Sequence, residues 1–318
     1  MHKKNIIYFL LIIIILIILY ILFNNQRKSI NVNNSFSVED TSVINKIFMA
    51  DRSGNSILLE RNRNEWIINN KYKARKDAIN VLLNTISQIK IQRPVPINSL
   101  ENVIKKMATT GVKIEIYTNN KKPLKIYTIG HSTSNHLGTY MLLDKGETPY
   151  IMHIPGFNGF LSPRYGIIGN RIDENKWRNT TIFNLNNKEI KNISVNHINY
   201  PDSSFYLSID KKILFDNNQN KIPYNAQKVK QFINHFQKLN CEVFKKDKSI
   251  LFNSNPIHIM IVNSDTLRTY EMNNSIIKKK EDNFNIQRMY ATLNNGELML
   301  IQNYVFNKVL ITINELKE

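Results

Sequence analysis

Residues 74–89 read ARKDAINVLLNTISQI, and their apolar side chains recur every three or four positions. This spacing places them on one face of an amphipathic helix; they are Ile79, Leu82, Leu83, Ile86 and Ile89. A shift of 150 residues brings the same five positions onto Val229, Phe232, Ile233, Phe236 and Leu239, beginning near Asn225. The sequence therefore predicts two helices with the same apolar stripe.

Strand-like segments flank the first helix on both sides. Short apolar or alternating segments bounded by turn residues are typical of strands. The predicted strands are residues 44–50 and 56–60, which form a hairpin around the turn 51–55, followed by 66–68, 112–116, 125–129, 140–143 and 150–154. The predicted order along the chain is strands, one helix, then strands again.

The same order recurs in the second half of the chain, which indicates an internal duplication. Under the shift of 150 residues, the hairpin positions Tyr140, Leu143, Gly146, Glu147 and Ile151 fall on Tyr290, Leu293, Gly296, Glu297 and Ile301. The strand with Ile257, Ile259 and Ile261 matches Val112, Ile114 and Ile116 at a shift of 145. Unrelated amphipathic helices can share a stripe, but one shift serves both the helix and the hairpin. We therefore predict an α+β protein of two related units, 36–180 and 181–318, each with antiparallel strands packed on one main helix.

An uninterrupted apolar run precedes these units. Residues 6–23 read IIYFLLIIIILIILYILF and contain no charge, glycine or proline. At about 1.5 Å per residue the run is long enough to cross the ~30 Å hydrocarbon core of a bilayer. A cleaved signal peptide is the alternative, but the run exceeds a typical signal core and no small-residue cleavage site follows it. We predict a transmembrane helix over 6–23, a short basic cytoplasmic tail over 1–5 and a linker over 24–35.

The orientation of this helix depends on the domain that follows it. Lys3 and Lys4 on one side are balanced by Arg27 and Lys28 on the other, so the flanking charges decide little. Long domains cross the membrane largely regardless of such charges. The prediction is a single-pass protein of the cytoplasmic (inner) membrane, with its C-terminal domain in the periplasm.

The net charge of +18 raises the question of a nucleic-acid partner. The basic residues are scattered, and the longest basic run is Lys278–Lys280. A basic groove interleaved with aromatic residues is not visible, which argues against nucleic-acid binding. Weak attraction to anionic lipid headgroups or to acidic envelope polymers stays open. A single cysteine excludes an intrachain disulfide.

Residues 153–165, HIPGFNGFLSPRY, form the most distinctive stretch of the chain. Arg164 lies between Pro163 and Tyr165, so a stiff backbone and an aromatic neighbour hold it in place. We predict that Arg164 contacts a partner or an anionic ligand, together with Tyr165, Phe157 and Phe160. In the alternative, Arg164 fastens the connection between the units by bonding backbone carbonyls. The aromatic residues are expected to pack between the two halves or to lie exposed.

Several motifs of the first unit resemble the bacterial domain-of-unknown-function family numbered 4340. They are Lys46-Ile47 with Ser53–Asn55, Trp66, Leu137–Leu143, Ile154–Phe157, Ser162–Tyr165 and Trp177-Arg178. The likeness covers roughly residues 36–185 and extends to the rest only in layout. The resemblance implies a membrane-anchored envelope protein, and some similar proteins are encoded beside gliding-type transporter components. It implies no reaction and no catalytic residues.

The sequence singles out no catalytic, metal or cofactor site. His131 and His136 are only two ligands, whereas zinc sites use three or four, so a solvated loop is the better interpretation. Cys241 would need a histidine beside it to act as a nucleophile, and we expect a partly buried small residue instead. The serine-hydrolase and phosphate-loop glycine motifs are missing.

The leading functional prediction is a non-enzymatic binding or scaffold component of an envelope complex, with an envelope protein as its partner. Association with a transporter or gliding machinery is what the resemblance implies. One alternative is an anchored hydrolase of cell-wall or surface glycan, which would show acidic or histidine side chains converging in an open cleft. Another is a small-ligand or lipid-binding module with a closed apolar pocket. The oligomeric state stays open.

Overall fold

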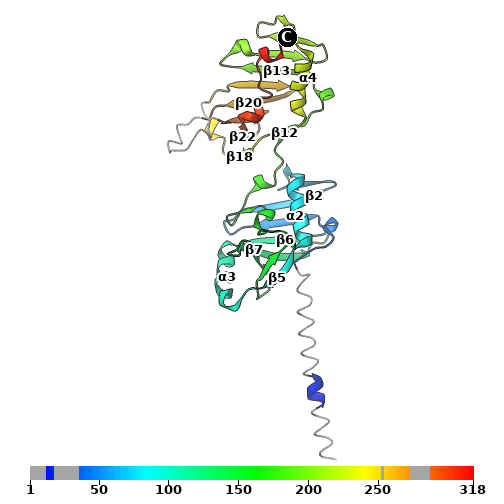
Figure 1. Cartoon of the computed structure of the whole chain (residues 1–318), viewed down its shortest axis with the longest axis vertical. Coiled ribbons are helices and arrows are strands. Elements are labelled where there is room, and N and C mark those ends of the chain that lie inside the picture. The colour runs from blue at the N-terminus through cyan, green and yellow to red at the C-terminus, as the bar shows by residue number, and fades with distance from the viewer. Residues whose placement is uncertain (1–11, 18–35, 252–253, 273–286) are drawn as a thin grey trace, which may run out of the picture. The chain divides into compact units, whose positions relative to one another are not determined.

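The protein consists of two compact units, one ending at Asn179 and the other beginning at Thr180. The computed structural model describes residues 12–17, 36–251, 254–272 and 287–318 (Figure 1). Both units combine antiparallel sheets with a few helices. The predicted mixed class of antiparallel strands and helices is thus confirmed.

The first unit is built on one nine-stranded antiparallel sheet, in the order β4-β3-β2-β1-β6-β7-β8-β9-β5. Its elements are η1 Thr41–Val43, β1 Lys46–Ala50, β2 Ser56–Asn62, β3 Glu65–Ile68, β4 Tyr72–Lys73, α2 Lys76–Gln88, β5 Lys90–Pro94, α3 Ile97–Thr110, β6 Val112–Tyr117, β7 Lys125–Ser132, β8 Thr139–Leu143, β9 Tyr150–His153, η2 Ser162–Tyr165, β10 Ile167–Ile168, β11 Arg171–Ile172 and η3 Glu174–Lys176. The predicted strands and the predicted helix of this unit are all present.

The second unit has a nine-stranded sheet with the same arrangement, in the order β16-β15-β14-β13-β19-β20-β21-β22-β18. Its elements are β12 Thr181–Phe183, η4 Asn187–Glu189, β13 Asn192–His197, η5 Pro201–Ser203, β14 Phe205–Ser208, β15 Ile213–Asp216, β16 Lys221–Ile222, α4 Ala226–Asn234, η6 His235–Gln237, β17 Leu239–Asn240, β18 Val243–Lys245, η7 Ser249–Leu251, β19 His258–Val262, β20 Asp265–Tyr270, β21 Arg288–Leu293, β22 Leu298–Gln302, α5 Asn303–Phe306 and α6 Ile313–Leu316. In each sheet the first four strands form a meander, and a helix then carries the chain to the opposite edge.

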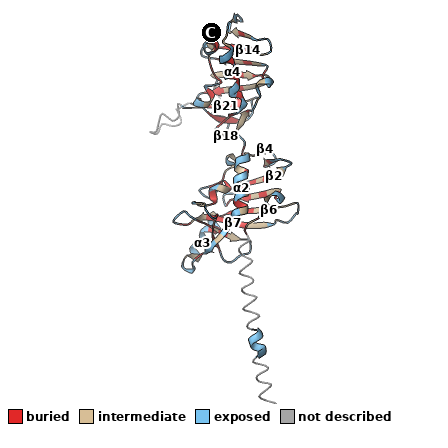
Figure 2. Ribbon diagram, turned by 45° about the vertical axis from the view of Figure 1, so that its right-hand side comes forward, coloured by how far each residue is buried: buried red, intermediate tan, exposed pale blue. Residues whose placement is uncertain are grey.

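The two main helices bury the stripes that the sequence predicts. Helix α2 buries Ile79, Leu82 and Ile86 together with Thr85, while Leu83 is half-buried at the margin of the stripe. Helix α4 and η6 bury the first four positions of their stripe, while the fifth, Leu239, is buried in β17 beyond the end of the helix. The Asn225 side chain caps α4 by accepting hydrogen bonds from its first turn. The outward surface of α2 is exposed (Figure 2). Each helix therefore covers one face of its sheet with apolar side chains, as amphipathic helices do.

The predicted alignment of strand 257–261 is wrong by one residue. Strand pairing places Met49 opposite Ile114 in the first unit and Val195 opposite Met260 in the second. Met260 is fully buried, whereas Ile259 is only half-buried, so the true offset from β6 to β19 is 146 residues. Because nearly every position of β19 is apolar, its sequence does not show which side chains face the core. A shift of one residue exchanges the two faces.

Helix α3 was not predicted. It covers the opposite face of the first sheet, where Val103 and Met107 pack against Ile151 in a small second core. The expected counterpart of Ile151, Ile301, lies instead in the main core of the second unit. Met152 lies opposite Thr139 of β8, and Ile301 lies opposite Met289 of β21. Since Thr139 and Met289 are equivalent under the shift of 150 residues, Met152 is the residue that corresponds to Ile301.

The predicted transmembrane helix lies mostly outside the described residues. Residues 12–17 are helical and exposed, while the rest of 6–23, the tail 1–5 and the linker 24–35 are not described. Within the ranges that the structure does describe, no helix combines the length and the apolar character needed to cross a bilayer.

Candidate functional site

The predicted contact region, residues 155–165, is a loop held against the first sheet. The Leu161 amide donates to the Thr139 hydroxyl of β8 at 2.7 Å, and the Ser162 hydroxyl donates to the Gly130 carbonyl of β7 at 3.3 Å. Gly156 adopts φ +80°, which lets the chain turn after β9. These bonds position η2, and with it Arg164, over one end of α2.

Arg164 is half-buried and held from two sides. Its Nε donates a 2.7 Å hydrogen bond to the Thr85 hydroxyl, which in turn donates to the Val81 carbonyl of α2. Its guanidinium carbon lies 4.8 Å from the centre of the Phe157 ring. The contact is therefore with a side chain of the same unit, and the alternative in which Arg164 bonds backbone carbonyls between units is not what the structure shows.

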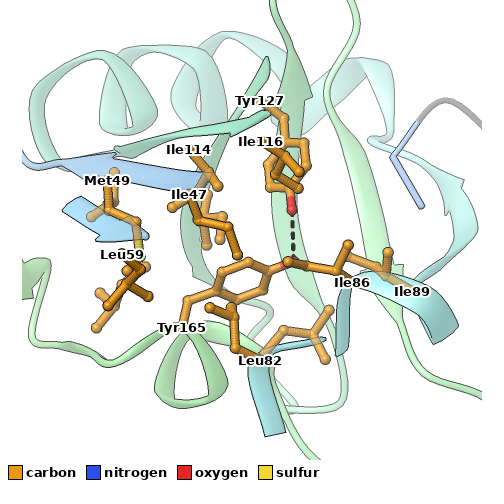
Figure 3. Packing of buried hydrophobic residues seen from close by; sticks show 14 of the residues in the cluster. Ile47, Met49, Leu59, Leu82, Ile86, Ile89, Ile114, Ile116, Tyr127 and Tyr165 are labelled. Carbon is orange, nitrogen blue, oxygen red and sulfur yellow. Dashed lines mark hydrogen bonds between the residues drawn. The ribbon is translucent and has the colours of Figure 1, made fainter. Parts of the chain in front are cut away.

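Tyr165 is not at the surface. It is fully buried, and its hydroxyl lies 2.9 Å from that of Tyr127, with the rings packed edge to face (Figure 3). Burial raises the pKa of both phenols, so both stay neutral. Trp177 is likewise buried in this core rather than between the units. Tyr165 thus supports the loop from beneath and cannot contact a partner directly.

The remaining aromatic residues do reach the surface. Phe157 and Phe160 are half-exposed, and the Phe160 ring packs against that of His136 at 5.7 Å. Leu137, beside His136, is 46% exposed. We call the surface formed by Phe157, Phe160, Arg164, His136 and Leu137 the Phe160 surface. It combines apolar rings with a cation that is already fixed in position.

The two histidines of the weak metal motif point to different neighbours. His136 Nδ1 lies 3.1 Å from the Ser132 hydroxyl, whereas the His131 ring packs on Tyr140 at 4.7 Å. Over the described ranges no group of three or more His, Cys, Asp or Glu side chains could hold a metal ion. Cys241, the other candidate, is buried in the core of the second unit.

Comparison with known families gives one match. Residues 66–252 fit the model of a family described as Domain of unknown function (DUF4340), which is more than half of the chain. The chain belongs to the DUF4340 family. The match ends well beyond residue 185, where the resemblance drawn from the sequence stops, and starts later, at Trp66. No curated protein and no solved structure matches the chain.

The limits of the DUF4340 match do not follow the structural units. The match starts at Trp66 in β3, after the first hairpin, and stops beyond η7, before β19. It therefore contains the Phe160 surface, but it omits strands from both sheets. The complete fold of this DUF4340 protein needs residues on either side of the matched region.

Sequence reasoning missed a histidine pair in the second unit. His197 of β13 lies opposite His258 of β19, and the rings meet edge to face at 5.0 Å. His197 Nε2 lies 3.0 Å from the Ile311 carbonyl, and His258 Nδ1 lies 2.8 Å from the Thr269 hydroxyl. Burial, with a smaller contribution from His197, lowers the pKa of His258 to about 4. Only the pairing of distant strands brings the two residues together, so no local pattern signals them.

The stability of this DUF4340 protein is expected to fall in mild acid. The pKa of His258 is depressed from 6.5 to about 4 in the folded chain, so between these values the unfolded chain binds the proton more strongly. The contribution of neutral His258 to the free energy of unfolding is complete above pH 6.5 and is lost as the pH falls towards 4. The protection factors of the β13 and β19 amides, which are corrected for the intrinsic pH dependence of hydrogen exchange, should therefore fall over this window.

The variant His258→Gln removes the titrating group and is expected to flatten that pH dependence. His153→Gln in β9 of the first unit is the matched control, because it also removes one histidine. An unchanged pH dependence in His258→Gln would show that another group is responsible.

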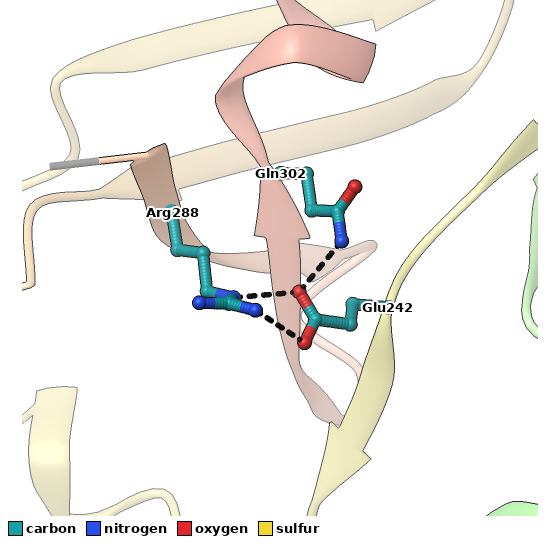
Figure 4. A network of polar contacts seen from close by, with 3 residues as sticks. All are labelled: Glu242, Arg288 and Gln302. Atoms are coloured by element: carbon teal, nitrogen blue, oxygen red, sulfur yellow. Dashed lines mark hydrogen bonds and ion pairs between the residues drawn. The ribbon is translucent and has the colours of Figure 1, made fainter. Parts of the chain in front are cut away.

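An ion pair joins Glu242, the residue before the edge strand β18, to β21 of the second sheet. Arg288 of β21 donates to both carboxylate oxygens of Glu242, at 2.7 and 3.1 Å, and the Gln302 amide of β22 donates to one of them at 3.1 Å (Figure 4). Arg288 is the main cause of the lowered pKa of Glu242. A carboxylate held ionised by two partners is suited to fastening strands rather than to proton transfer.

Proposed function

We propose that this chain is a membrane-anchored, extracytoplasmic component of an envelope complex that binds a protein partner and catalyses no reaction. The observation that supports this best is the Phe160 surface, where two half-exposed aromatic rings lie in the same loop as a pre-positioned arginine, and one of them, Phe157, packs against it. Some proteins that the sequence resembles are encoded beside gliding-type transporter components, so the partner that we propose is a subunit of a transporter or of gliding machinery.

The composition of the Phe160 surface suits a protein interface. Aromatic residues and arginine are enriched at the centres of such interfaces and carry much of their binding energy. Thr85 and Phe157 already restrain the Arg164 side chain, so binding would cost it little conformational entropy. Its terminal nitrogens would then donate to a carboxylate or carbonyl of the partner.

The apolar run 6–23 supports the membrane location, because its length matches the bilayer core. The linker 24–35 has 12 residues, which span at most about 40 Å when fully extended. This tether would keep the first unit, and the Phe160 surface with it, near the membrane. The equal strand order of the two sheets supports the duplication of one ancestral unit.

The glycan-hydrolase alternative needs carboxylates that are free to act. The most buried carboxylate of the first unit, Asp51, accepts hydrogen bonds from the amides of Ser53, Asn55 and Ile172 and from the Asn55 side chain. These bonds hold the turn between β1 and β2 and tie it to β11. The geometry therefore favours a structural role for Asp51.

Photo-crosslinking in intact membranes tests the proposal. A benzoylphenylalanine in place of Phe160 is expected to trap one envelope protein, and the Arg164→Ala variant should reduce that product about tenfold or more. The same probe at Tyr304, which is 78% exposed on α5 of the second unit, is the control position. A chain without residues 6–23 is expected in the soluble fraction and should lose the product. Equal trapping from Tyr304, or none from Phe160, would contradict the proposal.

A further inference from the structure

An open polar groove of about 540 Å³ lies on the first unit, away from η2 and its loop. It is bounded by the residue before β1, the end of β2, the β3–β4 turn and the connection between β6 and β7. Each of these four segments contributes asparagine to the lining; the residues are Asn45, Asn62, Asn70, Asn119 and Asn120. Basic side chains complete the lining; they are Lys46, Arg61 and Lys121.

The backbone beside the groove and two of its basic side chains, Arg61 and Lys46, are held in place by the following contacts. The Arg61 amide donates to the Asn45 carbonyl at 2.7 Å, and Arg61 Nη2 donates to the Thr41 carbonyl at 3.0 Å while its guanidinium lies over the Trp66 ring. Lys46 Nζ lies 4.1 Å from the centre of the Tyr117 ring. Lys46 and Arg61 are therefore held in position, and the carboxylates of Glu115 and Asp40 interact with them electrostatically.

Two polar atoms of the groove are buried without a hydrogen bond to any described residue: Asn45 Oδ1, an acceptor, and Arg61 Nε, a donor. The other amide atom of Asn45, Nδ2, donates to Asn119 Oδ1 at 2.7 Å. Leaving such atoms unpaired costs about 1–3 kcal/mol each. Because both atoms are buried, a ligand in the open groove would reach them only if the Asn45 or Arg61 side chain moved.

The corresponding connection of the second unit is much shorter, although its sheet has the same strand order. The β6–β7 connection runs from residue 118 to 124, whereas β19 and β20 are joined by the two residues Asn263 and Ser264. The Asn263 side chain accepts from the Lys191 amide at 2.8 Å and donates to the Glu189 carbonyl at 2.9 Å. That side chain thus bonds the segment that leads into β13, which corresponds to the segment with Asn45 before β1. The long β6–β7 connection that lines the groove has no equivalent between β19 and β20.

We propose that this groove binds an acidic saccharide, a short chain of hydroxylated sugar rings that carries carboxylate groups. Amide side chains recognise hydroxyl groups as donors and acceptors, and Lys46, Arg61 and Lys121 attract the carboxylates. Glu60 is the one carboxylate in the lining and leaves the groove with an excess of positive charge. The site is separate from the Phe160 surface, so either proposal can fail without the other.

Calorimetric titration of the full chain in detergent micelles tests this site. Trigalacturonate is the probe, with maltotriose as its uncharged analogue and inorganic phosphate as a plain anion. We expect trigalacturonate to bind with a dissociation constant below about 1 mM and more tightly than either comparison probe. The double variant Lys46→Gln with Lys121→Gln should weaken binding about tenfold or more.

The matched control is Lys211→Gln with Lys212→Gln, which removes two exposed charges from the β14–β15 turn of the second unit. It should leave trigalacturonate binding unchanged. Lack of binding at about 10 mM probe, equal affinity in the groove variant, or phosphate that binds as tightly as trigalacturonate would each overturn the saccharide site. Thermal unfolding of both variants verifies that a loss of binding is not a loss of folding.

Discussion

Replacing Tyr165 with alanine is expected to lower the free energy of unfolding of the first unit by about 4 kcal/mol. The ring is fully buried among Ile47, Leu82 and Ile86, so its removal leaves a cavity (Figure 3). The change also leaves the Tyr127 hydroxyl without its partner in a dry core. The cavity and the unpaired hydroxyl both lower the free energy of unfolding.

The hydroxyl contribution can be separated from the packing contribution. Tyr165→Phe keeps the ring but leaves the Tyr127 hydroxyl without a partner, so we expect the free energy of unfolding to fall by about 1–2 kcal/mol. Adding Tyr127→Phe removes both hydroxyl groups and should recover most of that loss, because no polar group is then buried unpaired. Both tryptophans, Trp66 and Trp177, lie in the core of the first unit, so denaturant unfolding followed by their fluorescence reports on that unit.

The same variants decide between the surface and the core interpretation of Tyr165. If Tyr165 made a surface contact, Tyr165→Ala would lose crosslinking at position 160 and keep its stability. If Tyr165 is a core residue, Tyr165→Ala lowers the free energy of unfolding, and Tyr165→Phe should still crosslink. Unchanged unfolding of Tyr165→Ala would show that the buried arrangement does not hold in solution.

Gly166→Ala is expected to destabilise the first unit by about 3 kcal/mol. Gly166 follows η2 and adopts φ +66°, which L side chains rarely adopt. A Cβ built there would lie 2.5 Å from Nε1 of the buried Trp177 ring. The indole is packed in the core and cannot move aside without disturbing its neighbours.

A nearby glycine provides the matched control. Gly169 has φ +51°, but an added Cβ there meets no atom within 4 Å. Gly169→Ala should therefore cost only the backbone strain, about 1 kcal/mol. Tryptophan fluorescence during denaturant unfolding measures both variants. If the two cost the same, strain alone explains the requirement for glycine, and the close approach of Trp177 has no energetic consequence.

The regular elements were largely predictable because each leaves a local period in the sequence. The stripes of α2 and α4 and the alternation in β6 follow directly from which side chains face a core. Helix α3 escaped prediction even though Val103 and Met107 are buried, because two buried residues make a weak stripe. The register of β19 could not be predicted because nearly all of its positions are apolar.

The candidate site was predictable only in part. Unusual composition singled out the loop with Phe157, Phe160 and Arg164, which does reach the surface. Nothing local distinguished these residues from Tyr165, whose burial depends on Tyr127 of a distant strand. The groove beside Asn45 and the pair His197–His258 were invisible for the same reason.

The sequence alone determined the two amphipathic helices, most of the strands around them and the family to which the chain belongs, since all of these depend on residues close together along the chain. Tertiary structure decided which face each strand turns to the core, which aromatic side chains are buried, and where polar residues from separate connections meet. These features depend on pairing between strands far apart in sequence. The energy of that pairing is shared among many residues, so no short segment records it.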